Sequence, residues 1–137
     1  MYIIDFGLSK EFRDPNTRAH IPYSCGRGFT RTAAFASINS HLGLELGRRD
    51  DLESLAYILI YFLRGFLPWH GPRKDIFALK RGFTSHDMLR DLPGEFRTFL
   101  EGCHSLAFHD KPNYDQYRNL FNNLFLQQGF EGNQLFD

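Results

Sequence analysis

The chain has 137 residues, which is enough for one domain with one hydrophobic core. Hydrophobic residues make up 42% of it and aromatic residues 16%, so the composition excludes a disordered chain. The 16 basic and 16 acidic residues cancel, so the net charge favours neither a nucleic-acid partner nor a membrane surface.

No segment of the sequence has the pattern of a secretory signal or a membrane anchor. The N-terminus lacks a basic region followed by an apolar region. The longest apolar stretch, residues 55–63, is far shorter than the ~20 residues that a bilayer-spanning helix needs. Cys25 and Cys103 are far apart and form no CxxC spacing, which favours reduced thiols. We therefore predict a soluble protein of the cytoplasm, the nucleus or both.

The first predicted elements are a short strand and a long loop. Residues 2–4 are β-formers and predict a strand that leads into an Asp-Phe-Gly turn. Residues 8–50 are rich in Gly, Ser, Thr, Asn, Arg and Pro with little hydrophobic periodicity, so we expect an ordered loop with a proline turn at 13–16. Loops of this length are uncommon unless they are functional.

The strongest helix signal covers residues 51–64. Asp50 or Asp51 can cap its start, and Gly65 and Pro68 can end it. Apolar residues fall on almost every side of this helix. That pattern predicts a helix buried at the centre of the fold.

Further helices are predicted in the second half of the chain. A short one lies within 74–82 and ends at Gly82, while residues 93–108 and 113–129 place apolar side chains at helical spacing. One strand, one long loop and several helices predict a mainly α fold. With no repeat, linker or low-complexity segment, residues 1–137 form a single predicted unit.

A series of motifs carries the functional prediction. In chain order they are "YIIDFGLSKEFRD", "HIPY", "FASINSHLGLELGRRDDLESLAYILIYF", "LPWHG" and "FHDKPNYDQYRNLF". In this order and near this spacing they resemble the casein kinase I family of serine/threonine protein kinases. The Ser-Ile-Asn at 37–39 stands where most protein kinases carry Ala-Pro-Glu, a peculiarity of this family. The resemblance covers essentially the whole chain and implies a partial kinase domain, namely an activation segment and a helical C-lobe without N-lobe or catalytic loop.

The resemblance implies a nucleotide site at the start of the chain. Asp5 matches the carboxylate that holds Mg²⁺ against the β- and γ-phosphates of ATP, and a carboxylate suits this hard cation. Phe6 would pack under the cleft, and Gly7 would give the turn its freedom. ATP and Mg²⁺ are therefore the cofactors expected in the complete kinase.

The resemblance also implies a substrate platform that begins in the activation segment, residues 8–39. Thr32 matches the threonine that hydrogen-bonds the catalytic loop. Asp51 matches the central-helix aspartate whose carboxylate accepts backbone N–H bonds from the same loop. Without the resemblance, Asp51 would be read as a helix N-cap and Asp5 as an ordinary turn residue.

The expected substrates are proteins with acidic or already phosphorylated residues upstream of the target Ser or Thr. In this family, basic groups beside the activation segment bind those anions, because guanidinium groups match phosphate oxygens. Arg27 and Arg31 lie in that region, and Arg73 and Lys74 are either helpers or part of a solvated basic loop. The usual anion-binding arginine is replaced by Ala34, so phosphate recognition is either weakened or rebuilt from Arg27 and Arg31.

Several parts of a phosphoryl-transferring kinase are missing from the sequence. A Gly-rich loop, a strand lysine paired with a helix glutamate, and a His-Arg-Asp catalytic loop are all required, and none is present. Without the catalytic aspartate nothing accepts the substrate proton, so we expect no phosphoryl transfer and no tight binding of ATP or Mg²⁺ by this chain alone.

Two interpretations remain open. The chain is either the C-lobe part of a serine/threonine kinase, an ATP-dependent transferase that is active only when complete, or a non-catalytic, pseudokinase-like binding module that uses the activation-segment platform. In both cases the apolar helix at 51–64 is expected to expose apolar surface and to favour association, because its cover would come from helices and a catalytic loop encoded upstream.

Overall fold

The computed structural model of the chain describes residues 6–7, 9–26, 32–69, 75–83 and 85–130. Its helices are α1 Ile38–His41, α2 Arg48–Arg64, α3 Ile76–Gly82, α4 Ser85–Met88, α5 Gly94–Ser105 and α6 Tyr114–Gln127. Outside these helices, β-pairing within the described ranges is limited to two isolated bridges, Arg13–His20 and Cys25–Leu44. The predicted mainly α fold is confirmed, while the predicted strand at 2–4 lies outside the described residues. None of the helices in this part of the chain has the length and hydropathy needed to cross a bilayer.

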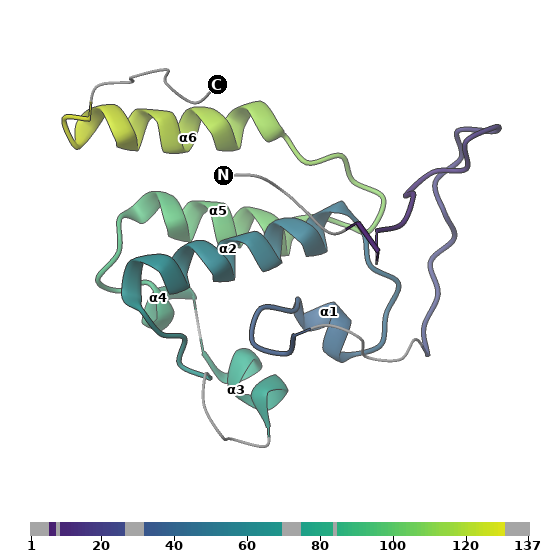
Figure 1. The fold of residues 1–137 in the computed structure, drawn as a ribbon, viewed down its shortest axis with the longest axis horizontal. Helices are drawn as coiled ribbons and strands as arrows, with labels where there is room; N and C mark the ends of the chain where they lie inside the picture. Colours follow the sequence, from purple (N-terminus) through teal and green to yellow (C-terminus); the bar gives the residue numbers. More distant parts are fainter. Residues whose placement is uncertain (1–5, 8, 27–31, 70–74, 84, 131–137) are drawn as a thin grey trace.

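The hydrophobic core forms where α2 packs against α5. Figure 1 shows these two helices side by side, with α6 along the outer side of α5 and with α1, α3 and α4 on the opposite side. The buried core side chains are Ala56, Tyr57, Ile60, Leu67, Trp69, Met88, Leu89, Phe99, Leu100 and Cys103. The two central helices and the loops that leave them therefore supply most of the core.

The central helix α2 begins three residues before its predicted start. Its N-cap is Gly47, and Asp50 accepts a hydrogen bond from the Gly47 N–H at 2.8 Å. The prediction that Asp50 or Asp51 is the N-cap is therefore wrong, because the two preceding arginines are good helix formers and extend the helix. The predicted end is confirmed, since Gly65 adopts a left-handed conformation (φ 76°) and its N–H bonds the Tyr61 carbonyl at 2.8 Å.

The burial predicted for this helix holds on one face only. Ala56, Tyr57 and Ile60 are buried, whereas Phe62 is 65% exposed and Leu63 is 53% exposed. The partly buried leucines of α2 are Leu52, Leu55 and Leu59. Apolar residues on every side of a helix predict complete burial only if other elements cover every side. The described elements cover the face of α2 that is turned toward α5 and the buried core.

The three helices predicted in the second half of the chain are confirmed as α3, α5 and α6. Asp75 caps α3 by accepting a hydrogen bond from the Ala78 N–H at 2.8 Å. Asn113 caps α6 in the same way, from the Gln116 N–H at 3.1 Å. These side-chain caps satisfy backbone donors that a helix start leaves unpaired. The short helices α1 and α4 were not predicted.

Of the loop predicted at 8–50, the described residues 9–26 contain no helix and include the predicted turn around Pro15, whereas residues 38–41 form α1 and residues 48–50 belong to α2. Asp14 Oδ1 accepts hydrogen bonds from the Asn16 N–H at 2.9 Å and the Thr17 N–H at 2.7 Å. These backbone hydrogen bonds, the one from Thr17 first, lower the pKa of Asp14. The turn is therefore fixed by a side chain that mimics a backbone acceptor.

Gly65→Ala is expected to lower the free energy of unfolding by about 1 kcal/mol, because a Cβ strains left-handed backbone. Gly82→Ala is the matched control, since Gly82 ends α3 and nothing lies within 4 Å of an added Cβ at either glycine. Urea unfolding at 25 °C measures both variants. Equal losses of stability would contradict the role of Gly65 as the left-handed cap.

Candidate functional site

Several of the predicted site residues lie outside the described part of the chain. These are Asp5, Arg27, Arg31, Arg73 and Lys74. The Mg²⁺ site at Asp5 and the anion site at the arginines therefore stay predictions.

The described chain begins with Phe6 and Gly7, which are both exposed. Phe6 is 68% exposed among the described residues, and its packing under a nucleotide cleft stays a prediction for the complete kinase. Its carbonyl oxygen accepts hydrogen bonds from the Ser9 N–H at 2.9 Å and the Ser9 Oγ–H at 2.6 Å. Phe6 of the Asp-Phe-Gly motif is thus linked to Ser9 by two hydrogen bonds.

Thr32 opens a segment that ends with α1 and that we call the platform segment, residues 32–41. Thr32 itself is exposed, and its carbonyl oxygen accepts hydrogen bonds from the N–H groups of Phe35 (3.1 Å) and Ala36 (3.2 Å). The backbone therefore makes a tight turn immediately before α1. The remaining contacts of this turn come from side chains that are distant in the sequence.

Three carbonyl groups of the turn accept hydrogen bonds from Lys80 and Trp69. Lys80 Nζ donates to the carbonyl oxygen of Ala33 at 2.9 Å and to that of Ala36. Trp69 Nε1 donates to the carbonyl oxygen of Ala34 at 2.7 Å. Both donor side chains are buried. Their hydrogen bonds therefore satisfy the carbonyl groups of the turn in place of water.

Lys80 is a buried cation, only 3% exposed. Its Nζ lies 4.7 Å from the ring centre of Tyr57 and 5.2 Å from that of Trp69, where aromatic faces stabilise positive charge. Burial lowers the pKa of Lys80 to about 8, and the negative charge of Glu53 opposes this shift. The lysine and the turn carbonyls satisfy one another in a place that water does not reach.

Glu53 fixes the start of α1 on the central helix. Its Oε1 accepts hydrogen bonds from the Ile38 N–H at 2.9 Å and the Tyr57 O–H at 2.7 Å. The same oxygen lies 3.5 Å from His104 Nε2 on α5. Burial alone raises the pKa of Glu53, but the hydrogen bonds from His104, Tyr57 and Ile38 outweigh it and lower the pKa. The carboxylate is therefore charged at neutral pH and is a strong acceptor.

A second link between α1 and α2 comes from Asp50. This buried carboxylate accepts a hydrogen bond from Asn39 Nδ2 at 2.8 Å. Asp51, the residue that matches the family aspartate, is exposed in the first turn of α2. The backbone donors that Asp51 is predicted to bind belong to a catalytic loop absent from this sequence, so its role stays a prediction.

Ala34 stands where the family carries an anion-binding arginine, and its side chain is only 8% exposed. A buried methyl group offers no charge to a phosphate. The platform segment contains neither lysine nor arginine. Anion binding by Arg27 and Arg31, with Arg73 and Lys74 either as helpers or as part of a solvated basic loop, stays a prediction.

Residues 9–26, in the first part of the predicted activation segment, are held to the rest of the fold by a buried carboxylate and an aromatic cluster. Glu45 accepts hydrogen bonds from Lys10 Nζ at 2.8 Å and from Ser24 Oγ at 3.0 Å. The aromatic cluster consists of Phe12, His20, Tyr23, Phe108 and His109. Residues 9–26 therefore follow a defined path from the Asp-Phe-Gly region toward the platform segment.

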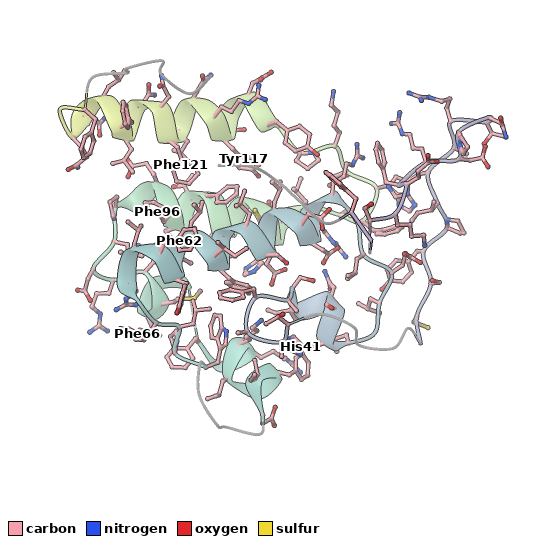
Figure 2. All side chains as sticks on the ribbon, viewed as in Figure 1. His41, Phe62, Phe66, Phe96, Tyr117 and Phe121 are labelled. Carbon is pink, nitrogen blue, oxygen red and sulfur yellow. The ribbon has the colours of Figure 1, made fainter. Side chains whose placement is uncertain are left out.

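An apolar groove of about 730 Å³ lies between α2, α5 and α6. The helix α6 rests on α5 through Phe96 and Phe121, whose ring centres are 5.1 Å apart (Figure 2). The groove opens beside this contact, and its apolar lining consists of Leu52, Leu55, Leu59, Phe99, Tyr114, Tyr117, Phe121 and Phe125. Its volume is that of a site for a small ligand or for part of a peptide.

No family model matches the chain. The likeness to the casein kinase I family therefore rests on the motifs of the sequence. Among the residues that the structure describes, no group of three or more His, Cys, Asp or Glu side chains is placed to hold a metal ion.

Lys80 and Glu53 were not predicted as site residues, although the sequence contains a signal for each. Glu53 is the single charged residue in the apolar run 52–63. Lys80 follows Ile76 by one helical turn, on the apolar face of a short helix. A charge on an apolar face indicates a buried polar contact, but the backbone groups that Lys80 and Glu53 bind in the platform segment are identified by no sequence pattern.

The pH dependence of stability tests the burial of Lys80. In unfolded chains this lysine has its ordinary pKa of 10.5, so between pH 8 and pH 9 the unfolded state binds more protons than the folded state. The free energy of unfolding is therefore expected to rise with pH by about 1 kcal/mol per pH unit more in the wild type than in Lys80→Met.

Urea unfolding at half-unit intervals of pH measures the two slopes. The interval ends at pH 9 because burial raises the pKa of Cys103 to about 12, which contributes with the opposite sign at higher pH in both proteins. Parallel curves for the two proteins would contradict a buried, titrating Lys80.

The exposed apolar groove is expected to make the isolated chain associate. Phe125→Glu, within the groove, should shift sedimentation velocity profiles toward the monomer, because a charge there costs desolvation energy on association. Leu126→Glu is the matched control on the neighbouring, exposed position, which does not line the groove. A wild-type chain that is monomeric and melts in one sharp transition would rule out this expectation, as would equal effects of both variants.

Proposed function

We propose that the chain is the helical, substrate-side part of a casein kinase I-type serine/threonine protein kinase. In this role it positions a protein substrate, and phosphate is transferred from ATP once a Gly-rich loop, a strand lysine and a catalytic loop complete the active site. The observation that carries the proposal is the platform segment, which follows the Asp-Phe-Gly region and is tied to α2 and α3 by buried side chains.

A substrate platform needs a backbone that keeps one position, since small displacements of a bound peptide reduce transfer rates strongly. Side chains from α2, from α3 and from the loop after α2 hold the platform segment in place. Glu53 and Asp50 hold α1, while Lys80 and Trp69 hold the turn before it. Thr32, at the edge of this fixed turn, is exposed and able to meet another polypeptide segment.

The apolar groove along α2 supports the proposal that a further segment completes the domain. The family resemblance implies that upstream helices and a catalytic loop cover the central helix. Leu52, Leu55 and Leu59 line the groove, so this side of α2 is open to such cover. Removing apolar area from water favours association, so a completing segment would gain binding energy from this face.

The roles of the remaining predicted residues follow from the family. Asp5 would hold Mg²⁺, which neutralises charge on the transferred phosphoryl group. Arg27 and Arg31 would bind acidic or phosphorylated residues upstream of the target Ser or Thr. Asp51 and Thr32 would hold the catalytic loop against the platform segment.

We assign the protein to the cytoplasm or the nucleus. Cys25, which is exposed, and Cys103, which is buried, are both free thiols. Free cysteines of this kind are typical of reducing compartments.

A non-catalytic binding module is the second candidate function. The observation that favours it is the buried methyl group of Ala34 at the position of the anion-binding arginine. In that case the platform segment binds a protein partner, and no phosphate is transferred.

Reconstitution from two parts tests the proposal. The chain is co-expressed with a polypeptide that contains the Gly-rich loop, strand lysine and catalytic loop of a casein kinase I-type kinase. Phosphate transfer is then measured on an acidic peptide and on its phosphoserine-primed form. We expect activity only when both parts are present, loss of it in Asp5→Ala, and retention of it in Asp91→Ala, a control at an exposed aspartate.

The outcomes separate the two candidates. Stable association without phosphate transfer would favour the binding module. Neither association nor transfer would contradict the kinase proposal.

A further inference from the structure

We propose that Lys80 is a positioning residue, which fixes the turn at 33–36 and thereby sets where Thr32 and the start of α1 lie. We call the two hydrogen bonds from Lys80 to this turn the clamp, and they are a property of the fold. The consequence of the clamp for a bound peptide rests on the proposed function, because only there does the platform segment meet a substrate.

The geometry of the turn carries this inference. Lys80 Nζ reaches the carbonyl oxygens of Ala33 and Ala36, which lie at the two ends of the turn. One ammonium group thereby closes the turn across its open side. The bond to Ala36 is buried and the bond to Ala33 is partly buried, so loss of the donor leaves at least one buried acceptor unsatisfied, which is costly.

The position of Lys80 on α3 gives the clamp a fixed base. The helix α3 packs against α1, and His41 at the end of α1 stacks on Phe77 of α3 with ring centres 5.9 Å apart. Burial first, and then the positive charge of Lys80, lower the pKa of His41, while its hydrogen bond to the Ala33 backbone opposes the shift. Lys80 and His41 therefore converge on the same backbone group from two helices.

A purely packing role does not account for an amine at this position. Burying a cation costs free energy, and an apolar side chain of the same length would fill the space beneath Tyr57 and Trp69 without that cost. The hydrogen bonds of Lys80 go to neutral carbonyl groups of the turn. The amine is therefore explained by the carbonyl groups that it binds rather than by the space that the side chain fills.

The titratable groups around Lys80 come from all the helices packed at this point. They are Glu53 and Tyr57 on α2, His41 on α1, and Cys103 and His104 on α5. The two groups on α5 interact with Glu53 and affect Lys80 through it. Glu53 is the negative charge among them that favours the ammonium form of Lys80. The same carboxylate binds the Ile38 N–H, so the charge that supports the clamp also holds the next element of the platform segment.

Hydrogen–deuterium exchange of the full chain tests the clamp. In Lys80→Met, amide exchange at residues 33–38 is expected to rise about tenfold relative to the amides of α5, because two buried hydrogen bonds are lost. Arg81→Met is the matched control, since Arg81 is the next residue of α3 and is exposed. Unchanged exchange at 33–38, or an equal rise throughout the chain, would overturn the positioning role.

The wild-type chain provides a measurement that does not depend on the folding of a variant. The ¹³C carbonyl shifts of Ala33 and Ala36 are expected to titrate together with a midpoint near the pKa of Lys80, about 8, while Ala107, an exposed alanine, does not follow. Carbonyl shifts of Ala33 and Ala36 that stay as constant with pH as that of Ala107 would also overturn the clamp.

The reconstituted pair tests the consequence for the substrate. Lys80→Met is expected to lower kcat/KM for the peptide by about tenfold with the KM for ATP unchanged, while Arg81→Met keeps wild-type values. If the wild-type pair is active and Lys80→Met is as active, the positioning role is wrong. If the wild-type pair transfers no phosphate, the proposed function fails, and the exchange experiment still decides the clamp.

Discussion

The buried hydrogen bonds of Lys80 and Glu53 hold the platform segment in the fold. Lys80 closes the turn before α1, and Glu53 binds the first N–H of α1. The two charges come from different helices, and each lies in a place where an uncompensated charge would be costly. Because backbone groups and aromatic faces compensate them, one stretch of irregular chain acquires a defined position. The position of Thr32 depends on that arrangement.

The helices could be predicted from the sequence, because periodicity and caps are local properties. The end of α2 at Gly65 and the extent of α5 and α6 follow directly from such signals. The start of α2 at Arg48 and the short helix α1 could not be predicted. The helix α1 is held by Glu53 and Asp50, which belong to another helix, while α2 starts early because two arginines extend it and Asp50 accepts the Gly47 N–H.

The residues of the candidate site also fall into two groups, those that the sequence indicates and those that only the structure brings together. Family motifs point to Asp5, Thr32 and Asp51, while the structure brings Lys80, Trp69 and Glu53 together around one turn. These three side chains bind mainly backbone groups, and a backbone acceptor leaves no pattern in a sequence. The one-sided burial of α2 was likewise invisible to periodicity, because periodicity reports what a helix could bury and not what covers it.

The account holds that this chain is one part of a kinase active site. Its most direct test is the native protein, captured from its own cells with an antibody to α6 and identified by intact mass and peptide sequencing. The account predicts that the captured material contains a Gly-rich loop, a strand lysine and a catalytic aspartate, in the same polypeptide or in a bound companion. Captured material without any of these groups would contradict the account.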